Sequence, residues 1–454
     1  MGIFKAYDIR GVVPTQLDAD LAYRIGNAFA RFLEAKTLVV GQDMRTHSPE
    51  IADAVSRGMR DAGADVIRLG LSSTPMTYYG IATQPCCGGL IVTASHNPGE
   101  YNGMKLCSEG AKPISKANGI ADIERMCAEP APPPVANPGS ERSVDLLEEY
   151  ADHVAKFANV TRPIKVAVDL GNGIVGHTLP SLLERVPNIE ADVLFETPDG
   201  TFPNHEANPL LEENLKDVQE LVKKTGAAVG VAYDGDGDRC CFVDETGTTV
   251  SADLMTALLA PTFAKANAGS PIIYDLRSSW VVKEEIQNAG AKPIRDRVGH
   301  SFIKATMRET GAVFGGELSG HFYFAENFKT DSGAIAMMSA LSFLSAPENQ
   351  GKTLSELVRG LRRYSSTGEI NFEVDDKDAM IATLKERYSD GRQDELDGIT
   401  VEFGDLGDAD WWWFNVRPSN TEPLLRLNLE GATEAIRNQK RDELMAILGT
   451  PVSH

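Results

Sequence analysis

The sequence lacks the features of several protein classes. Its 454 residues contain no apolar run near the roughly 20 residues of a membrane-spanning helix, and the N-terminus shows no signal-peptide pattern. The six cysteines have no CxxC spacing, which argues against a zinc ribbon or a disulfide framework and favours a reducing compartment. Only 44 basic residues stand against 65 acidic ones, and the net charge of −21 repels nucleic acid and anionic membranes. We therefore expect a cytoplasmic protein with no nucleic-acid or membrane partner.

The chain does have material for several hydrophobic cores. Hydrophobic residues make up 42% of it, and its length corresponds to about three domains of roughly 150 residues. Apolar runs at residues 38–40, 66–69 and 89–92 alternate with helical spacing over 21–32 and 48–59, where Ser48 is the expected N-cap. This order predicts parallel strands covered by helices, and similar patterns restart near residues 164 and 271. From about residue 366 the pattern indicates a smaller α+β domain.

The first chemical motif is the segment from Thr93 to Pro98, directly after the apolar run at 89–92. Ligands in α/β folds bind at the carboxyl ends of strands, so Ser95 and His96 are placed where a nucleophile would stand. For an isolated Ser-His pair, however, a simple turn with local caps is the favoured interpretation. The GxSxG elbow of serine hydrolases is absent.

The second motif places Asp234, Asp236 and Asp238 at alternate positions separated by glycines. Three carboxylates so close together repel one another unless a cation lies between them, which predicts a divalent-cation site, with Mg²⁺ favoured. An EF-hand is a poor alternative, because Arg239 stands where that loop needs glycine and the flanking residues have strand character. A solvated acidic turn is the other alternative.

Two further loops carry polar groups that suit a phosphorylated sugar. The loop 315–321 offers hydrogen-bonding groups for hydroxyls, and the loop 417–423 offers a guanidinium with small polar side chains for a phosphate. Each alone is compatible with an ordinary turn or surface loop. Together the four loops predict a cleft for a phosphosugar, with Ser95 accepting and donating the phosphoryl group.

The motifs as a set resemble a known family. In order along the chain stand FKAYDIRG at 4–11, the Ser95 loop, NGMK at 102–105, DGTFPN at 199–204, the Asp234 loop, GH at 299–300, and the Glu317 and Arg417 loops. This series resembles the α-D-phosphohexomutase superfamily, most closely its bacterial phosphomannomutase and phosphomannomutase/phosphoglucomutase group.

The resemblance implies an α/β fold of four domains around a central cleft. The first three domains share similar mixed α/β sheets, and the fourth is a smaller α+β domain. We expect the limits 1–148 for the phosphoserine domain, 149–252 for the metal-binding domain, 253–365 for the sugar-recognition domain and 366–454 for the phosphate-binding domain. The mechanism of the superfamily further implies a hinge motion that brings Arg417 to the cleft.

The resemblance also assigns roles to individual residues. Catalysis falls to Ser95, His96, Lys105 and Arg10. One Mg²⁺ per chain is implied at phosphorylated Ser95 with Asp234, Asp236 and Asp238, supported by Arg239. Substrate contacts are implied for Glu317, Ser319, His321, His300, Arg277, Arg417, Ser419, Asn420 and Thr421. Because the chain is acidic overall, we expect Arg10, Lys105, Arg239, Arg417 and the ion to form one local positive cleft.

The implied activity is that of a phosphomannomutase, an isomerase of mannose 6-phosphate and mannose 1-phosphate that can also accept glucose phosphates. The phosphoserine enzyme and a hexose 1,6-bisphosphate are its intermediates, and the bisphosphate is also its activator. A phosphoglucomutase, a phosphoglucosamine mutase and a non-catalytic phosphosugar-binding protein are the alternatives. The sequence leaves open whether the chain is a monomer or a dimer.

Overall fold

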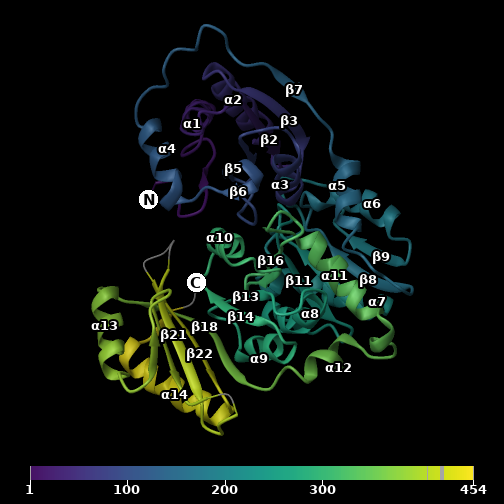
Figure 1. The fold of residues 1–454 in the computed structure, drawn as a ribbon, viewed down its shortest axis with the longest axis vertical. Coiled ribbons are helices and arrows are strands. Elements are labelled where there is room, and N and C mark those ends of the chain that lie inside the picture. The colour runs from purple at the N-terminus through teal and green to yellow at the C-terminus, as the bar shows by residue number, and fades with distance from the viewer. Residues whose placement is uncertain (1, 406, 420–423, 453–454) are drawn as a thin grey trace.

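The computed structural model describes residues 2–405, 407–419 and 424–452. They form four sheets, one after another along the chain, and the predicted domain limits serve below as names for the four parts. Figure 1 shows the first domain at the top, the second and third beside and below it, and the fourth at the lower left. Within these residues no helix is long and apolar enough to cross a membrane.

The first domain is a seven-stranded sheet with helices packed on it. The strand order is β1-β5-β4-β2-β3-β7, with β6 paired to β5. Its strands are β1 (Ile9–Val12), β2 (Thr37–Gln42), β3 (Asp65–Leu71), β4 (Gly88–Val92), β5 (Tyr101–Ser108), β6 (Lys112–Pro113) and β7 (Glu141–Ser143); its helices are α1 (Ala19–Phe32), α2 (Ser48–Asp61), α3 (Thr74–Thr83) and α4 (Ile120–Cys127).

The second domain is a five-stranded sheet in the order β12-β11-β10-β8-β9. Its strands are β8 (Ile164–Asp169), β9 (Ile189–Leu194), β10 (Val229–Tyr233), β11 (Cys240–Asp244) and β12 (Thr249–Val250); its helices are α5 (Leu147–Ala155), α6 (Val175–Arg185) and α7 (Lys216–Thr225).

The third domain repeats the same number of strands in the order β14-β13-β15-β16-β17. Its strands are β13 (Pro271–Asp275), β14 (Lys292–Asp296), β15 (Phe314–Gly316), β16 (Phe322–Phe324) and β17 (Thr330–Asp331); its helices are α8 (Ala252–Ala266), α9 (Trp280–Asn288), α10 (His300–Thr310), α11 (Gly333–Ser345) and α12 (Leu354–Arg359).

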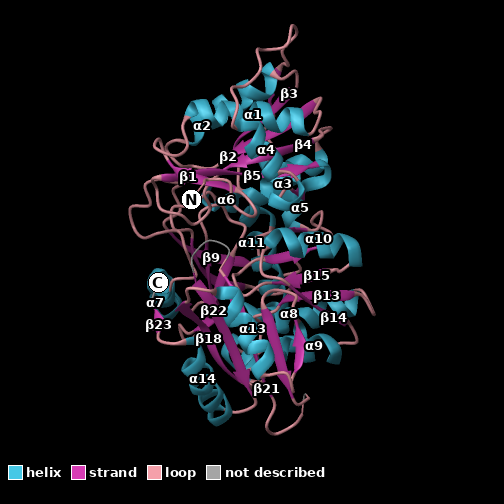
Figure 2. Ribbon diagram, turned by 90° about the vertical axis from the view of Figure 1, so that its left-hand side faces the viewer, coloured by secondary structure: helices cyan, strands magenta, loops and turns pink. Residues whose placement is uncertain are grey.

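The fourth domain is different, because all of its strand pairs are antiparallel. Its sheet has the order β19-β20-β21-β22-β18-β23. The elements are β18 (Ser365–Glu373), β19 (Arg392–Asp394), β20 (Ile399–Phe403), β21 (Trp412–Pro418), β22 (Leu424–Gly431), β23 (Pro451–Val452), α13 (Lys377–Arg387) and α14 (Glu434–Leu448). Figure 2 shows its long strands in the lower part of the molecule, away from the sheet of the first domain.

The first three sheets share one arrangement of five strands in space, although β1 comes first in its domain whereas β12 and β17 are the last strands of theirs. In each, three parallel strands are followed by two antiparallel ones: β3-β2-β4 then β5 and β1, β9-β8-β10 then β11 and β12, and β14-β13-β15 then β16 and β17. The fold class predicted from the sequence is therefore confirmed. The expectation that Ser48 caps α2 was wrong in detail: the helix begins at Ser48, and its hydroxyl donates to Asp43 instead.

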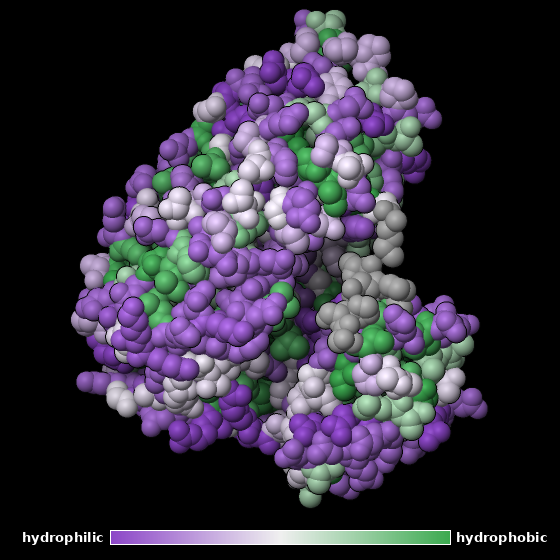
Figure 3. All heavy atoms as spheres, turned by 180° about the vertical axis from the view of Figure 1, so that it is seen from behind, coloured by the Kyte–Doolittle hydropathy of each residue, from purple (hydrophilic) through white to green (hydrophobic). Residues whose placement is uncertain are grey.

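The space-filling view shows a deep hollow on one side of the molecule, between the fourth domain and the rest (Figure 3). The ends of the strands that carry the predicted motifs meet around this region, as the contacts of their side chains show below.

Candidate active site

Three of the predicted loops occupy the same place in three related sheets. The Ser95 loop joins β4 to β5, the Asp234 loop joins β10 to β11, and the Glu317 loop joins β15 to β16. Each loop therefore begins at the carboxyl end of the last parallel strand and leads into the first antiparallel one. Because this edge of a sheet is where α/β folds bind ligands, the repeated topology brings one loop from each domain to a common site.

Ser95 lies at the centre of the contacts between these loops. Its backbone has a φ of +51°, in the left-handed region that is uncommon for residues other than glycine, and its side chain is fully buried. The hydroxyl donates to Asp234 Oδ2 at 2.8 Å and lies 3.2 Å from His96 Nδ1. Gly235 permits this approach, since a Cβ there would stand 2.4 Å from the carbonyl oxygen of Ser95.

A buried arginine that the sequence reasoning missed lies beneath the Ser95 loop. Arg45 follows β2, and its guanidinium pairs with Asp43 at 3.3 Å with both side chains fully buried. It also donates four hydrogen bonds of 2.6 to 3.0 Å to backbone carbonyl oxygens of the loop, those of Ser95, Asn97, Pro98 and Tyr101. One side chain thus fixes the backbone of Ser95 and of the loop that follows it.

The three aspartates of the second motif are fully buried and face one another. Each offers a carboxylate oxygen within 4.8 Å of those of the others. Thr74, at the start of α3, donates to Asp236 Oδ2 at 2.6 Å, whereas the buried Asp236 Oδ1 accepts no hydrogen bond within the described structure. Burial and the two neighbouring carboxylates raise the pKa of Asp234 well above its usual range. An all-oxygen cluster with an unsatisfied oxygen fits a hard divalent cation.

Lys105 of β5 places its ammonium group against this cluster. Its Nζ donates to Asp236 Oδ2 at 2.6 Å and also to Asp238 Oδ2. Burial alone would lower the pKa of Lys105, but the carboxylates of Asp236 and Asp238 raise it well above its usual range, so the ammonium stays charged. Arg239 lies 3.7 Å from Asp234 and adds a second fixed positive charge.

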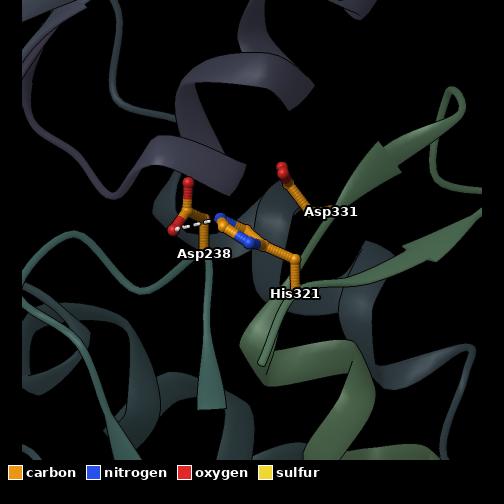
Figure 4. A group of neighbouring side chains, drawn as sticks. All are labelled: Asp238, His321 and Asp331. Carbon is orange, nitrogen blue, oxygen red and sulfur yellow. Dashed lines mark ion pairs between the residues drawn. The ribbon is translucent and has the colours of Figure 1, made fainter. Parts of the chain in front are cut away.

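A second group of possible metal ligands, Asp238, His321 and Asp331, lies beside the first (Figure 4). His321 Nε2 is 3.4 Å from Asp238 Oδ1, and His321 Nδ1 is 3.2 Å from Glu317 Oε2. Burial opposes the charged imidazolium, but Asp238 outweighs it and raises the pKa of His321 to about 9. Since a metal binds the neutral imidazole, His321 is an ion-pair partner of these carboxylates.

The Glu317 loop presents a carboxylate that is fixed on both oxygens. Glu317 accepts from the Gly299 backbone at 3.0 Å and from the Tyr323 hydroxyl at 2.8 Å. Burial would raise its pKa, but His321 and Arg277 lower the pKa of Glu317 to about 2, so it is ionised. Ser319 lies 2.9 Å from His321 Nδ1.

Arg277 and Arg10 lie at the edges of this site, each held by a neighbouring carboxylate. Arg277 donates to Asp275 at 2.7 Å and lies 3.7 Å from Glu317. Arg10 donates to Asp8 at 2.7 Å and to the side chain of Asn97 in the Ser95 loop at 2.6 Å.

His96, next to Ser95, has a neutral ring. Its burial and the positive charges of Arg239, Arg10 and Lys105 hold the pKa of His96 well below its usual range.

The fourth-domain motif lies further from this cluster. Arg417 ends β21, is almost fully buried, and donates to Glu369 of the same domain at 2.7 Å. Burial lowers the pKa of Arg417, and the nearby charge of Arg277 in the third domain lowers it further. Ser419, two residues after Arg417, is nearly buried, whereas Asn420 and Thr421 lie outside the described residues.

The cations expected in the cleft are all paired with carboxylates. Each of the four predicted cations lies against a carboxylate: Arg10 against Asp8, Lys105 against Asp236 and Asp238, Arg239 against Asp234, and Arg417 against Glu369. These contacts form a network of ion pairs. Its attraction for an anion therefore depends on a cation that neutralises the aspartates.

The family comparisons agree with this arrangement. Four family profiles match the chain in order: phosphoglucomutase/phosphomannomutase alpha/beta/alpha domains I, II and III at residues 1–131, 148–247 and 251–364, and the C-terminal domain at 369–447. The chain belongs to the phosphoglucomutase/phosphomannomutase family. It is therefore a phosphohexomutase, an enzyme of the isomerase class.

Individual members of the phosphoglucomutase/phosphomannomutase family are similar over almost the whole chain. A phosphomannomutase of Escherichia coli is 39% identical over 98% of both chains, and one of Vibrio cholerae is 38% identical with the same coverage. A crystal structure described as a phosphoglucomutase/phosphomannomutase family protein from Burkholderia thailandensis has a TM-score of 0.89 and 32% identity, covering 99% of this chain and 98% of its own. The family resemblance inferred from the motifs is confirmed.

Several residues that build the site of this phosphohexomutase were not found from the sequence. Asp43 and Arg45 directly follow β2, so the rule that polar residues at strand ends form sites could have found them. Lys304, Asp331 and Tyr78 gave no such signal, because they stand inside or beside helical and apolar segments and meet only in the folded chain.

Proposed function

We propose that this phosphohexomutase is a phosphomannomutase that interconverts mannose 6-phosphate and mannose 1-phosphate through phosphorylated Ser95 and a hexose 1,6-bisphosphate. The observation that supports this most is the hydrogen bond from Ser95 Oγ to Asp234 within a cluster of three buried carboxylates and Lys105. A hydroxyl held against a cation site is suited to phosphoryl transfer. The mannose preference is supported by the relatives at 38–39% identity that are named phosphomannomutase.

The cation that suits the cluster is Mg²⁺, held by Asp234, Asp236 and Asp238 together with the phosphate on Ser95. When bound, it would offset the negative charge of the phosphoryl group during transfer. Lys105 and Arg239 contribute fixed positive charge on the same side of the site.

Two phosphoryl transfers, from Ser95 to the sugar and back to Ser95, make up the proposed reaction. The bond between phosphorus and Ser95 Oγ breaks while a bond to the free O1 or O6 of the sugar forms, and the sugar hydroxyl gives its proton to His96. Arg10 and Lys105, also assigned to catalysis, stay charged and stabilise the negative charge of the group in transfer. The neutral His96 beside Ser95 Oγ has a free nitrogen lone pair for this task. Return of the other phosphate to Ser95 completes the isomerisation.

The remaining residues hold the sugar and its second phosphate. We assign Glu317 and Ser319 to sugar hydroxyls, with His321, His300 and Arg277 around them. Arg417 and Ser419, with Asn420 and Thr421, are assigned to the phosphate that does not react. The 1,6-bisphosphate has to reverse its orientation in the cleft between the two transfers. Each of its phosphates must therefore fit both the position beside Ser95 and the position beside Arg417.

The test combines substrate kinetics with intact-mass analysis. Turnover of mannose 1-phosphate and glucose 1-phosphate is measured with Mg²⁺ and a trace of the 1,6-bisphosphate, and we expect a higher kcat/KM for the mannose compound. Ser95→Ala should remove the added phosphate mass and lower kcat by about 10⁴-fold or more. The exposed Ser140→Ala in the same domain serves as the control. Turnover that survives in Ser95→Ala would refute the nucleophile assignment.

Glucose phosphates are the second candidate substrates. The family profiles include phosphoglucomutases in their description, and relatives from Xanthomonas campestris at 39% identity are named phosphohexose mutases. Equal or higher kcat/KM for glucose 1-phosphate in the same kinetic comparison would replace the mannose preference while leaving the phosphoserine mechanism in place.

A further inference from the structure

One buried lysine contacts His300, a predicted substrate-binding residue. Lys304 belongs to α10 and is fully buried. Its Nζ lies 2.9 Å from Asp331 Oδ1 and donates to the Tyr78 hydroxyl at 3.1 Å. The third neighbour is His300 Nδ1 at 3.4 Å, one helical turn earlier. An ammonium group has three N–H bonds and no lone pair, so toward each of these neighbours Lys304 can only donate.

This arrangement determines which nitrogen of His300 carries the proton. Because Lys304 can only donate, His300 Nδ1 has to offer its lone pair, and the single proton of a neutral ring is then on Nε2. Burial and the positive charges of Lys304, Lys105 and His321 hold the pKa of His300 well below its usual range, while Asp238 acts in the opposite direction. The ring is therefore neutral, with Nδ1 occupied by Lys304.

The exposed part of His300 borders the candidate site. Its ring centroid lies 6.0 Å from that of His321 and 5.8 Å from that of Tyr7, and the residue is only half-buried. With Nδ1 turned toward Lys304, the N–H at Nε2 is the polar group that His300 has left for a ligand in the cleft.

We propose that Lys304 is a positioning residue of the phosphohexomutase reaction: it holds His300 as the Nε2–H tautomer, so that His300 donates a hydrogen bond to a substrate oxygen and does not act as a base. The proposal rests on the proposed function, since it assumes a hexose phosphate in the cleft. It restricts the group that His300 binds to an acceptor, either a sugar oxygen or a phosphate oxygen.

The contact depends on the docking of two domains. Tyr78 lies in α3 of the first domain, whereas Lys304, His300 and Asp331 belong to the third. One turn after Lys304, Arg308 donates to the carbonyl oxygens of Ala111 in the first domain at 3.2 Å and Phe328 in the third at 3.0 Å. The helix that carries His300 is thus fixed to the domain that carries Ser95.

The test reads the tautomer directly, in the full-length protein labelled with ¹⁵N-histidine. The two ring nitrogens have widely different ¹⁵N shifts depending on which bears hydrogen, and loss of signals in His300→Gln assigns the residue. The wild type should show a protonated Nε2 and an unprotonated Nδ1. Because Lys304→Met alone leaves Asp331 buried without its cation, the test variant is the neutral pair Lys304→Met with Asp331→Asn.

In the double variant we expect a mixture of tautomers at His300 and a kcat/KM lower by about tenfold, as for the loss of one well-placed hydrogen bond. Lys352→Met, an exposed lysine of the same domain, should change neither. A wild-type ring protonated on Nδ1, or a folded double variant with unchanged tautomer and unchanged kcat/KM, would overturn the proposal. If the wild type turned over no hexose phosphate, the proposed function would fail while the tautomer assignment could still stand.

Discussion

The first three domains and the fourth are held together in different ways. One hydrophobic core runs through all of the first three, from Val39 and Tyr78 through Val168 and Val231 to Leu341. The fourth domain has a core of its own around β20, β21 and β22. Its contact with the third domain instead rests on a small aromatic cluster of Trp280, Trp411 and Trp413 and on ion pairs such as those of Arg295.

The difference separates a fixed half of the site from a half that can move. The nucleophile, the carboxylate cluster and the sugar loop all belong to the continuous body, where Ser95, Asp234 and Lys105 are almost fully buried and paired. Arg417 belongs to the part that is joined through fewer contacts. A hinge between the third and fourth domains, as predicted from the sequence, is therefore compatible with the way the cores are divided.

The strongest test of the fixed half is Arg45→Met. The change leaves Asp43 buried without its cation and removes four donors from the Ser95 loop, so we expect a loss of about 3–5 kcal/mol in the free energy of unfolding of the body. Displacement of Ser95 should lower kcat by about 100-fold or more. Denaturant unfolding and steady-state kinetics measure the two effects.

Arg57→Met, an exposed arginine on α2, is the matched control for this change. A stable Arg45→Met variant with normal turnover would show that the nucleophile loop holds its shape without the buried guanidinium. The body would then not be the rigid half of the site.

The mobile half is tested by Arg417→Lys. A lysine keeps the charge but loses the fork of donors that suits a phosphate, so kcat/KM for the hexose 1-phosphates should fall by about 10- to 100-fold. The stability of the body should stay unchanged, because the hydrogen bond of Arg417 is with Glu369 of its own domain. Arg392→Lys, an exposed position in the same domain, controls for the exchange, and an equal loss there would remove the argument for a phosphate clamp.

Much of this division could be predicted from the sequence. Periodic apolar runs followed by polar residues identified β4 and β10 and the loops after them, because strand ends carry sites and the pattern is local. Arg417 was found because its loop combines arginine and proline with small polar residues. These predictions need only a few consecutive residues.

The rest depends on long-range packing. Arg45 looks like any charged residue after a strand, and only the folded chain shows it beneath a loop some 50 positions later. Lys304 could not be identified from the sequence for the same reason. Its partner Tyr78 belongs to the first domain, and its partner Asp331 belongs to strand β17 of the third. The ion pairs between the predicted cations and carboxylates could not be predicted either. The net charge of a sequence does not show which charged residues lie close together in the folded chain.

The last test concerns the joint itself, where Glu430 of the fourth domain is almost fully buried. Glu430 Oε2 accepts from the Trp280 backbone at 2.9 Å and from Trp413 Nε1 at 3.0 Å, with Asp253 nearby. Burial raises the pKa of Glu430 to about 7. Since the folded pKa lies above the unfolded one, the contribution of Glu430 to stability should be largest below about pH 4.5 and decline as pH rises to about 7, by up to about 3 kcal/mol.

Glu430→Gln should remove this slope, because glutamine keeps an acceptor for the tryptophans and cannot ionise. All four tryptophans of the chain, at 280, 411, 412 and 413, lie at the joint or in the fourth-domain sheet, so their fluorescence during urea unfolding at pH 5 and pH 8 reports this part of the molecule. We expect the wild type to lose stability between the two pH values relative to the variant. If the stabilities of the wild type and of Glu430→Gln had the same pH dependence, ionisation of Glu430 would cost little free energy in the folded state. The contact between the third and fourth domains would then be more accessible to water than the burial of Glu430 implies.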